Sequence, residues 1–215
     1  MNNNIASPIL RLLSGLIDGL ILFAITFLFI LKISVSTNLF TLMDSLLGYF
    51  LVFLFFSLFS PFVISFMISY FGGTIGKLLT DTRIVDSKGK YLSFWRAFYR
   101  NHLGYMVSGV FLWLGFVWIL KDREKQGWHD IMAGSWVIVR KKVGLILGII
   151  SVFILLGLNY FLVKTTVTNF LINKSVYLDI YEDVKKSFEK ETPDENLIPQ
   201  EDFTLDESYE VGLLI

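Results

Sequence analysis

The sequence predicts an all-α integral membrane protein, built as a small bundle of membrane-spanning helices. Three observations predict this class. Hydrophobic residues make up 54% of the 215 residues, and the mean hydropathy of +0.61 is above that of an ordinary soluble domain. Three apolar stretches are each long enough to cross a bilayer as a helix. Lys and Arg gather in two of the connecting segments, as they do in loops on the cytoplasmic side of a membrane.

The apolar stretches run from about Ile9 to Leu31, from about Leu46 to Tyr70, and from Val143 to Val163. Pro61 lies within the second stretch and should kink its helix, which membrane helices tolerate because neighbouring groups bond the freed carbonyl. The N-terminus lacks the basic region and the cleavage site of a signal peptide. We therefore expect the first stretch to remain as a membrane helix.

The segment 94–120 is open to two interpretations. Its first part places Arg96 and Arg100 on one helical face among aromatic residues, which is typical of a helix lying in the membrane interface. Its second part, 103–120, carries no charge but is only eighteen residues long, the minimum length for crossing. The segment is either a re-entrant or interfacial element, or a fourth span.

The distribution of positive charge favours the re-entrant or interfacial interpretation. The segments 71–93 and 121–142 carry four and six Lys or Arg residues, whereas the segment between the first two spans carries only Lys32. A single crossing by 94–120 would put the two basic segments on opposite faces of the membrane. We therefore expect both basic segments and the N-terminus on the cytoplasmic side.

Each basic segment also contains a short β-prone piece. Residues 82–86 alternate between polar and apolar side chains before a turn, and residues 135–139 form a second such piece. A small sheet that joins the two pieces would bury their edges, and it requires both basic segments to lie on the same face.

The chain changes composition after the third span. Residues 1–163 hold fourteen Lys or Arg against seven Asp or Glu, whereas residues 164–215 hold five against twelve. We expect 164–215 to be an acidic tail outside the cytoplasm. It should form an amphipathic helix over 177–188 and become flexible after Pro193.

Asp18 lies inside the first span, where a carboxylate costs roughly 2.5–3.5 kcal/mol to insert. Arg11 lies on the same side of the helix, but about 10 Å away along the axis by helical rise, too far to pair directly. Asp18 is therefore either a site for a cation or proton, or half of a buried ion pair. The spacing of Gly15 and Gly19 predicts close packing against another helix. Candidate partners for the pair are the basic residues Lys77, Arg96 and Arg100.

Two further segments carry candidate functional residues. Residues 72–77 resemble a phosphate-binding loop but lack its first glycine and the Ser or Thr after Lys77, so we predict a tight turn with Lys77 at the membrane interface. In the polar segment 121–130, His129 could carry protons near neutral pH. The alternative is an interfacial loop in which Trp128 anchors at the headgroups and Asp130 caps the next element.

Several classes of function are not expected. The chain has no cysteine, which excludes disulfides and thiolate metal sites, and its two histidines are too few for a histidine metal cluster. We see no arrangement of nucleophile and base and no paired carboxylates of a hydrolase. We therefore expect no catalytic residues, no metal or other cofactor, no enzymatic activity and no nucleic-acid partner.

A set of short motifs taken together resembles the RDD family of membrane proteins, over about residues 5–142. Arg11 starts the first span and Asp18 lies within it. A glycine turn ending in Lys follows at Gly72–Lys77, and two later motifs lie at Arg83–Asp86 and Gln126–Gly134. One departure is Ile75, where many relatives carry proline. The span at 143–163 and the tail at 164–215 lie outside the resemblance.

The family is named for one arginine and two aspartates. Arg11 and Asp18 match the first two of these residues. We choose Asp130 as the second aspartate, with Asp86 and Asp122 as rivals.

The resemblance implies a role in transport, since some members are described as sodium/proton antiporters. Our first hypothesis is exchange of a monovalent cation for a proton at Asp18, with Arg11, Asp130 and His129 as further candidates. Three or four spans are too few to enclose a pathway, so exchange would require a homodimer.

The second hypothesis is a non-transporting membrane scaffold or accessory subunit. In it Arg11 and Asp18 hold helices together, the basic segments bind anionic lipid, and the acidic tail meets a protein partner. The composition favours the plasma membrane of a bacterium as the location under either hypothesis.

Overall fold

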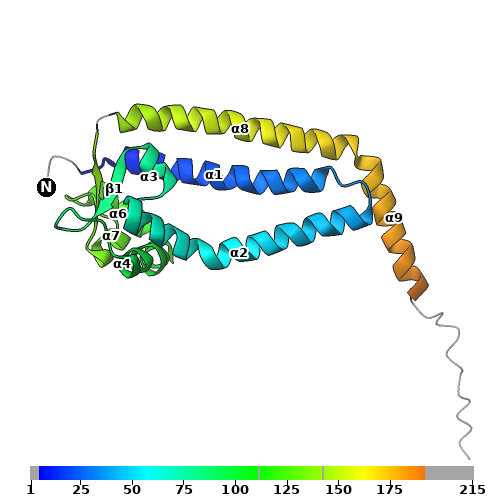
Figure 1. The fold of residues 1–215 in the computed structure, drawn as a ribbon, viewed down its shortest axis with the longest axis horizontal. Coiled ribbons are helices and arrows are strands. Elements are labelled where there is room, and N and C mark those ends of the chain that lie inside the picture. The colour runs from blue at the N-terminus through cyan, green and yellow to red at the C-terminus, as the bar shows by residue number, and fades with distance from the viewer. Residues whose placement is uncertain (1–4, 111, 142, 192–215) are drawn as a thin grey trace, which may run out of the picture. The chain divides into compact units, whose positions relative to one another are not determined.

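The computed structural model describes residues 5–110, 112–141 and 143–191. Three of its helices are long and apolar enough to cross a membrane, as the sequence predicts, and they are α1 (Pro8–Ser34), α2 (Leu39–Phe71) and α8 (Gly144–Ile172). Figure 1 shows these helices running alongside one another, with α1 and α8 pointing in one direction and α2 in the other. The chain is thus an all-α membrane protein.

The helices are longer than the apolar stretches that predict them. Asn38 caps α2 by accepting a hydrogen bond from the Thr41 amide at 2.9 Å, so this helix begins well before Leu46. The helix α8 continues from Val163 to Ile172 through Lys, Thr and Asn residues, which lower hydropathy without breaking a helix. Hydropathy therefore locates the apolar part of each helix rather than its ends.

The helices α1 and α8 pack against each other along their length (Figure 1). Asn159 of α8 donates a hydrogen bond to the Leu20 carbonyl at 3.1 Å, and Asn173 donates one to the Ser34 carbonyl at 3.0 Å. Gly148 permits the close approach, because a Cβ at this position would clash with the Leu13 side chain. Polar bonds between apolar helices fix their register where no hydrophobic driving force does so.

The shorter elements gather at the end of the bundle where α1 begins (Figure 1), which we call the basic end. It holds two strands, a π-helix (η1) and five short α-helices, in the order α3 (Ile75–Leu79), β1 (Thr82–Val85), α4 (Phe94–Tyr99), η1 (Arg100–Gly104), α5 (Tyr105–Val110), α6 (Leu114–Lys121), α7 (Trp128–Ala133) and β2 (Trp136–Val139). The main cluster of buried hydrophobic residues lies here and includes Ile68, Ile84, Leu92, Ala97 and Val137. Single residues of the spans, Ile17 and Leu162 among them, are buried as well.

The strands β1 and β2 form the small sheet that the sequence predicts. They pair antiparallel with Arg83 opposite Ile138, and the Ala6 amide donates to the Val137 carbonyl at 2.8 Å. Because paired strands bracket 94–120, that segment leaves and returns at the same end of the bundle. Its two helical parts, 94–110 and α6, meet at 93°. This geometry favours a re-entrant or interfacial element over a straight fourth span, and we call 94–120 the re-entrant segment.

The helix α9 (Lys174–Glu191) falls mainly in a second unit of the chain, 175–215. It contains the segment 177–188 that the sequence predicts as an amphipathic helix. Lys185 and Glu189 form an ion pair one turn apart along it, at 3.8 Å. The acidic segment after Pro193 that was expected to be flexible lies outside the described residues.

Candidate functional site

Asp130 is the centre of a buried ion-pair cluster at the basic end. Its Oδ2 accepts a hydrogen bond from the guanidinium of Arg11 in α1. Its Oδ1 accepts from Nη2 of Arg100 at 2.5 Å and from Nε at 3.0 Å. Asp130 and Arg100 are both 0% exposed. One carboxylate thus bridges two guanidinium groups that come from the first span and from the re-entrant segment.

The local sequence around α7 holds this carboxylate in place. The amide of Gly127, just before the helix, donates to Oδ2 of Asp130 at 3.1 Å. At the other end of α7, Arg96 donates to the carbonyls of Ala133 and Gly134 at 2.6 and 2.8 Å. A cation at a helix C-terminus satisfies carbonyls that have no partner within the helix. Arg96 therefore fixes α4 against α7.

The cluster keeps Asp130 ionised. Burial alone would raise the pKa of Asp130, but the guanidinium groups of Arg100 and Arg11 hold it well below the usual range of a carboxyl. A carboxylate in this setting carries a negative charge at neutral pH and does not exchange a proton there.

His129 is packed inside the basic end and is only 2% exposed. Its Nδ1 lies 3.2 Å from Oγ of Ser108, and its ring contacts the rings of Tyr105 and Phe116. Burial, together with the nearby charge of Arg100, lowers the pKa of His129 to about 3. A neutral, enclosed imidazole fits a packing role better than proton transfer near pH 7.

Asp18 lies next to the start of the short helix α3. Its Oδ2 accepts a hydrogen bond from the Thr74 hydroxyl at 2.6 Å, and its Oδ1 accepts from the Gly76 amide at 2.7 Å. Amides in the first turn of a helix have no partner within the helix, so Asp18 serves as a cap supplied by another part of the chain. An ion pair with Lys77, Arg96 or Arg100 is one of the two alternatives that the sequence leaves open for Asp18. Arg96 and Arg100 bond to groups of α7 instead, and among the described residues Asp18 forms no ion pair within 4.0 Å.

The close packing that the spacing of Gly15 and Gly19 predicts occurs at other glycines. Gly76 lies directly against α1, where a Cβ would clash with the Ser14 carbonyl oxygen. Gly15 and Gly19 have no atom within 4 Å of an added Cβ. Within this chain, the close approach to α1 occurs at Gly76 and Gly148, and not at the two glycines of α1 itself.

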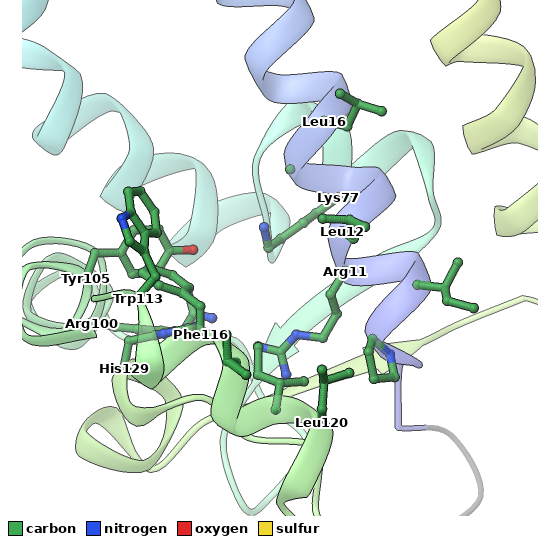
Figure 2. Close-up of a pocket in the computed structure, with 15 residues that line it drawn as sticks. Arg11, Leu12, Leu16, Lys77, Arg100, Tyr105, Trp113, Phe116, Leu120 and His129 are labelled. Carbon is green, nitrogen blue, oxygen red and sulfur yellow. The ribbon is translucent and has the colours of Figure 1, made fainter. Parts of the chain in front are cut away.

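Lys77, which the sequence places in a tight turn at the membrane interface, is largely enclosed by protein. Its side chain is 9% exposed and lines a cavity of about 680 Å³ between α1 and the re-entrant segment. Figure 2 shows Lys77 facing this space together with Arg11, Arg100 and Trp113. Sequence reasoning misses the cavity because its wall exists only after 94–120 folds back over α1.

The two rival aspartates serve local turns. Asp86 accepts hydrogen bonds from the amides of Lys88 and Lys90 at 2.8 and 2.9 Å. Asp122 accepts from the amides of Glu124 and Gln126. Of the three aspartates considered, Asp130 is the one that contacts Arg11.

Comparison with known proteins places these residues in a family. The model of the RDD family matches residues 5–134, which is more than half of the chain. The chain belongs to the RDD family. No curated protein and no solved structure matches it. The match covers Arg11, Asp18 and Asp130 of this RDD protein and ends just before β2, whereas α8 lies beyond it.

Proposed function

We propose that this RDD protein is a non-transporting membrane scaffold or accessory subunit, and that its buried charges hold the fold together. The observation that carries the proposal is that both central carboxylates already have structural partners. Asp18 caps α3 through Thr74 and Gly76, and Asp130 bridges Arg11 and Arg100.

Exchange of a cation for a proton would require a carboxylate that binds and releases ions. Release of the Thr74 and Gly76 bonds from Asp18 would uncap α3 and separate it from α1. At Asp130, two guanidinium groups would repel an incoming cation. Ion exchange at either carboxylate would therefore destabilise the fold, whereas a scaffold leaves these bonds intact.

One observation favours exchange as a second candidate. Asp18 is a half-buried carboxylate in a membrane span with the Thr74 hydroxyl at 2.6 Å, and oxygen ligands of this kind suit hard cations. Under this candidate a homodimer would supply the remaining wall of the pathway.

As a scaffold, the protein would lie in a bacterial plasma membrane with its basic end in the cytoplasm. Exposed basic residues at this end, among them Arg123, Arg140 and Lys141, would attract anionic lipid, at about 1 kcal/mol for each residue near the surface.

The experiment is reconstitution of the purified chain into vesicles that hold a pH-sensitive dye, with a panel of monovalent cations outside. We expect no cation-dependent pH change with the wild type or with Asp18→Asn. Asp44→Asn is the matched control, because Asp44 is exposed and lies near the start of α2, away from the basic end. Reproducible flux with the wild type and Asp44→Asn that is lost in folded Asp18→Asn would overturn the scaffold proposal in favour of exchange.

A further inference from the structure

The basic end contains a largely enclosed lysine, Lys77, that has no counter-ion among the described residues. Lys77 is only 9% exposed as a residue, and its ammonium group opens onto the cavity, where it has no hydrogen bond and no carboxylate oxygen within 4.0 Å among the described residues. An ammonium group that faces a partly enclosed and largely apolar space is stabilised by an anion beside it. The position is stable if an anion from outside the chain supplies the missing charge.

The cavity around Lys77 has an excess of positive charge. Arg11 and Arg100 also line it, and the one carboxylate they contact is Asp130. His129 lines the cavity as a neutral ring. Three cations against one anion leave two positive charges. Asp18 does not line the cavity, because its oxygens face the start of α3.

The remaining wall of the cavity is apolar and faces outward from the bundle. Leu12 and Leu16 of α1 form one side and are 75% and 47% exposed, and Trp113, at 67% exposed, forms part of the other. Figure 2 shows these side chains around the same space as Lys77. In a membrane, exposed apolar side chains of this kind contact acyl chains. A volume of about 680 Å³ is within the ordinary range of a ligand site.

We propose that this cavity binds one anionic phospholipid from the bilayer. The phosphate pairs with Lys77, and an acyl chain lies against Leu12, Leu16 and Trp113. A free inorganic anion would leave the apolar wall without a contact. A zwitterionic lipid would add a positive group to a site whose net charge is already +2. The site goes beyond the scaffold proposal and does not depend on whether Asp18 exchanges ions.

The test titrates the full, delipidated chain in detergent with dioleoylphosphatidylglycerol and counts bound lipid by native mass spectrometry. Dioleoylphosphatidylcholine and inorganic phosphate are the comparison ligands. We expect one tightly bound phosphatidylglycerol and about tenfold weaker binding in Lys77→Gln, because a charge-assisted contact with the phosphate is lost. Lys88→Gln removes the same charge from an exposed turn at the same end and should change binding less than twofold.

A second pair of variants tests the apolar part of the site without altering charge. Gly15 lines the cavity and Gly19 does not, and an added Cβ meets no atom within 4 Å at either position. We expect Gly15→Leu to fill the cavity and displace the lipid, and Gly19→Leu to bind as the wild type does.

Three results would overturn the phospholipid site. These are unchanged binding in both Lys77→Gln and Gly15→Leu, an equal loss in Lys88→Gln, and binding of phosphatidylcholine or inorganic phosphate as tight as that of phosphatidylglycerol. None of them bears on cation flux, so the failure of this site is distinct from the failure of the scaffold proposal.

Discussion

Arg11 and Asp130 form a buried ion pair although 119 residues separate them in the sequence. Arg11 belongs to the first membrane span and Asp130 to the last short helix of the basic end. Arg100 from the re-entrant segment binds the other oxygen of the same carboxylate. One side chain therefore joins three segments that the sequence places far apart.

Asp130→Asn should destabilise the protein strongly. Removal of the carboxylate charge leaves two buried guanidinium groups without a counter-ion, and such a change costs about 3–5 kcal/mol. Asp44→Asn breaks an exposed pair with Lys32 and should cost no more than about 1 kcal/mol. Thermal unfolding of both variants in the same detergent measures the difference, and equal midpoints would contradict the structural role of Asp130.

Asp18 and Thr74 should be coupled in free energy. Asp18→Ala removes the cap of α3 and should cost about 0.5–2 kcal/mol. Thr74→Val removes the hydroxyl that donates to the same carboxylate. In a double-mutant cycle of unfolding free energies we expect a coupling of about 0.5–3 kcal/mol, the range for residues in direct contact. Additive effects would show that the two side chains act independently.

Gly76→Ala should separate α3 from α1. The added methyl group would clash with the Ser14 carbonyl oxygen, which is backbone and cannot move aside as a side chain can. We expect a loss of about 1–3 kcal/mol. Gly19→Ala is the control, because its methyl group meets open space and improves helix propensity. A Gly76→Ala protein as stable as Gly19→Ala would contradict the close contact.

The free energy of unfolding should fall as the pH drops from about 6.5 to about 4.5. The folded pKa of His129, about 3, lies below its ordinary value of 6.5, so between these values the unfolded chain binds a proton that the folded chain does not. One such proton corresponds to about 1.4 kcal/mol for each pH unit. His129→Gln should flatten this slope, whereas His102→Gln, at a partly exposed position, should not. Identical pH profiles of the two variants would remove the assignment to His129.

Both basic segments should be accessible from the same side of the membrane. The chain has no cysteine, so single cysteines report position without interference. We expect Lys88→Cys and Glu124→Cys to react with an impermeant maleimide on one side, and Thr37→Cys, in the turn between α1 and α2, on the other. The positive-inside rule assigns the first side to the cytoplasm. Labelling of Lys88→Cys and Glu124→Cys on opposite sides would contradict the β1–β2 pairing.

The sequence predicts the spans, the sheet and the family because each rests on a local or compositional signal. Hydropathy locates three helices, alternation locates β1 and β2, and short motifs indicate the RDD family, which the match over 5–134 confirms. The loop charges predict that 94–120 returns to its starting face. These signals can be identified in the sequence without knowing how the elements pack.

The partners of individual side chains could not be predicted in the same way. Helical rise excludes an Arg11–Asp18 pair but does not say which distant group replaces it. Asp18 bonds to a backbone amide, and any residue type at position 76 except proline supplies one, so no sequence signal marks the contact. The Lys77 cavity likewise depends on the 93° bend of the re-entrant segment over α1.

The contacts of α1 also set an order for biosynthesis. This helix is translated before the elements that pack against it, since the strand beside its N-terminus, the acid that neutralises Arg11 and the helix α8 that lies along it all come much later in the chain. Until those segments are made, Arg11 and Asp18 lack the partners that they have in the folded protein. A chain truncated before Asp130 should therefore insert without assembling, and should be a substrate for membrane quality control.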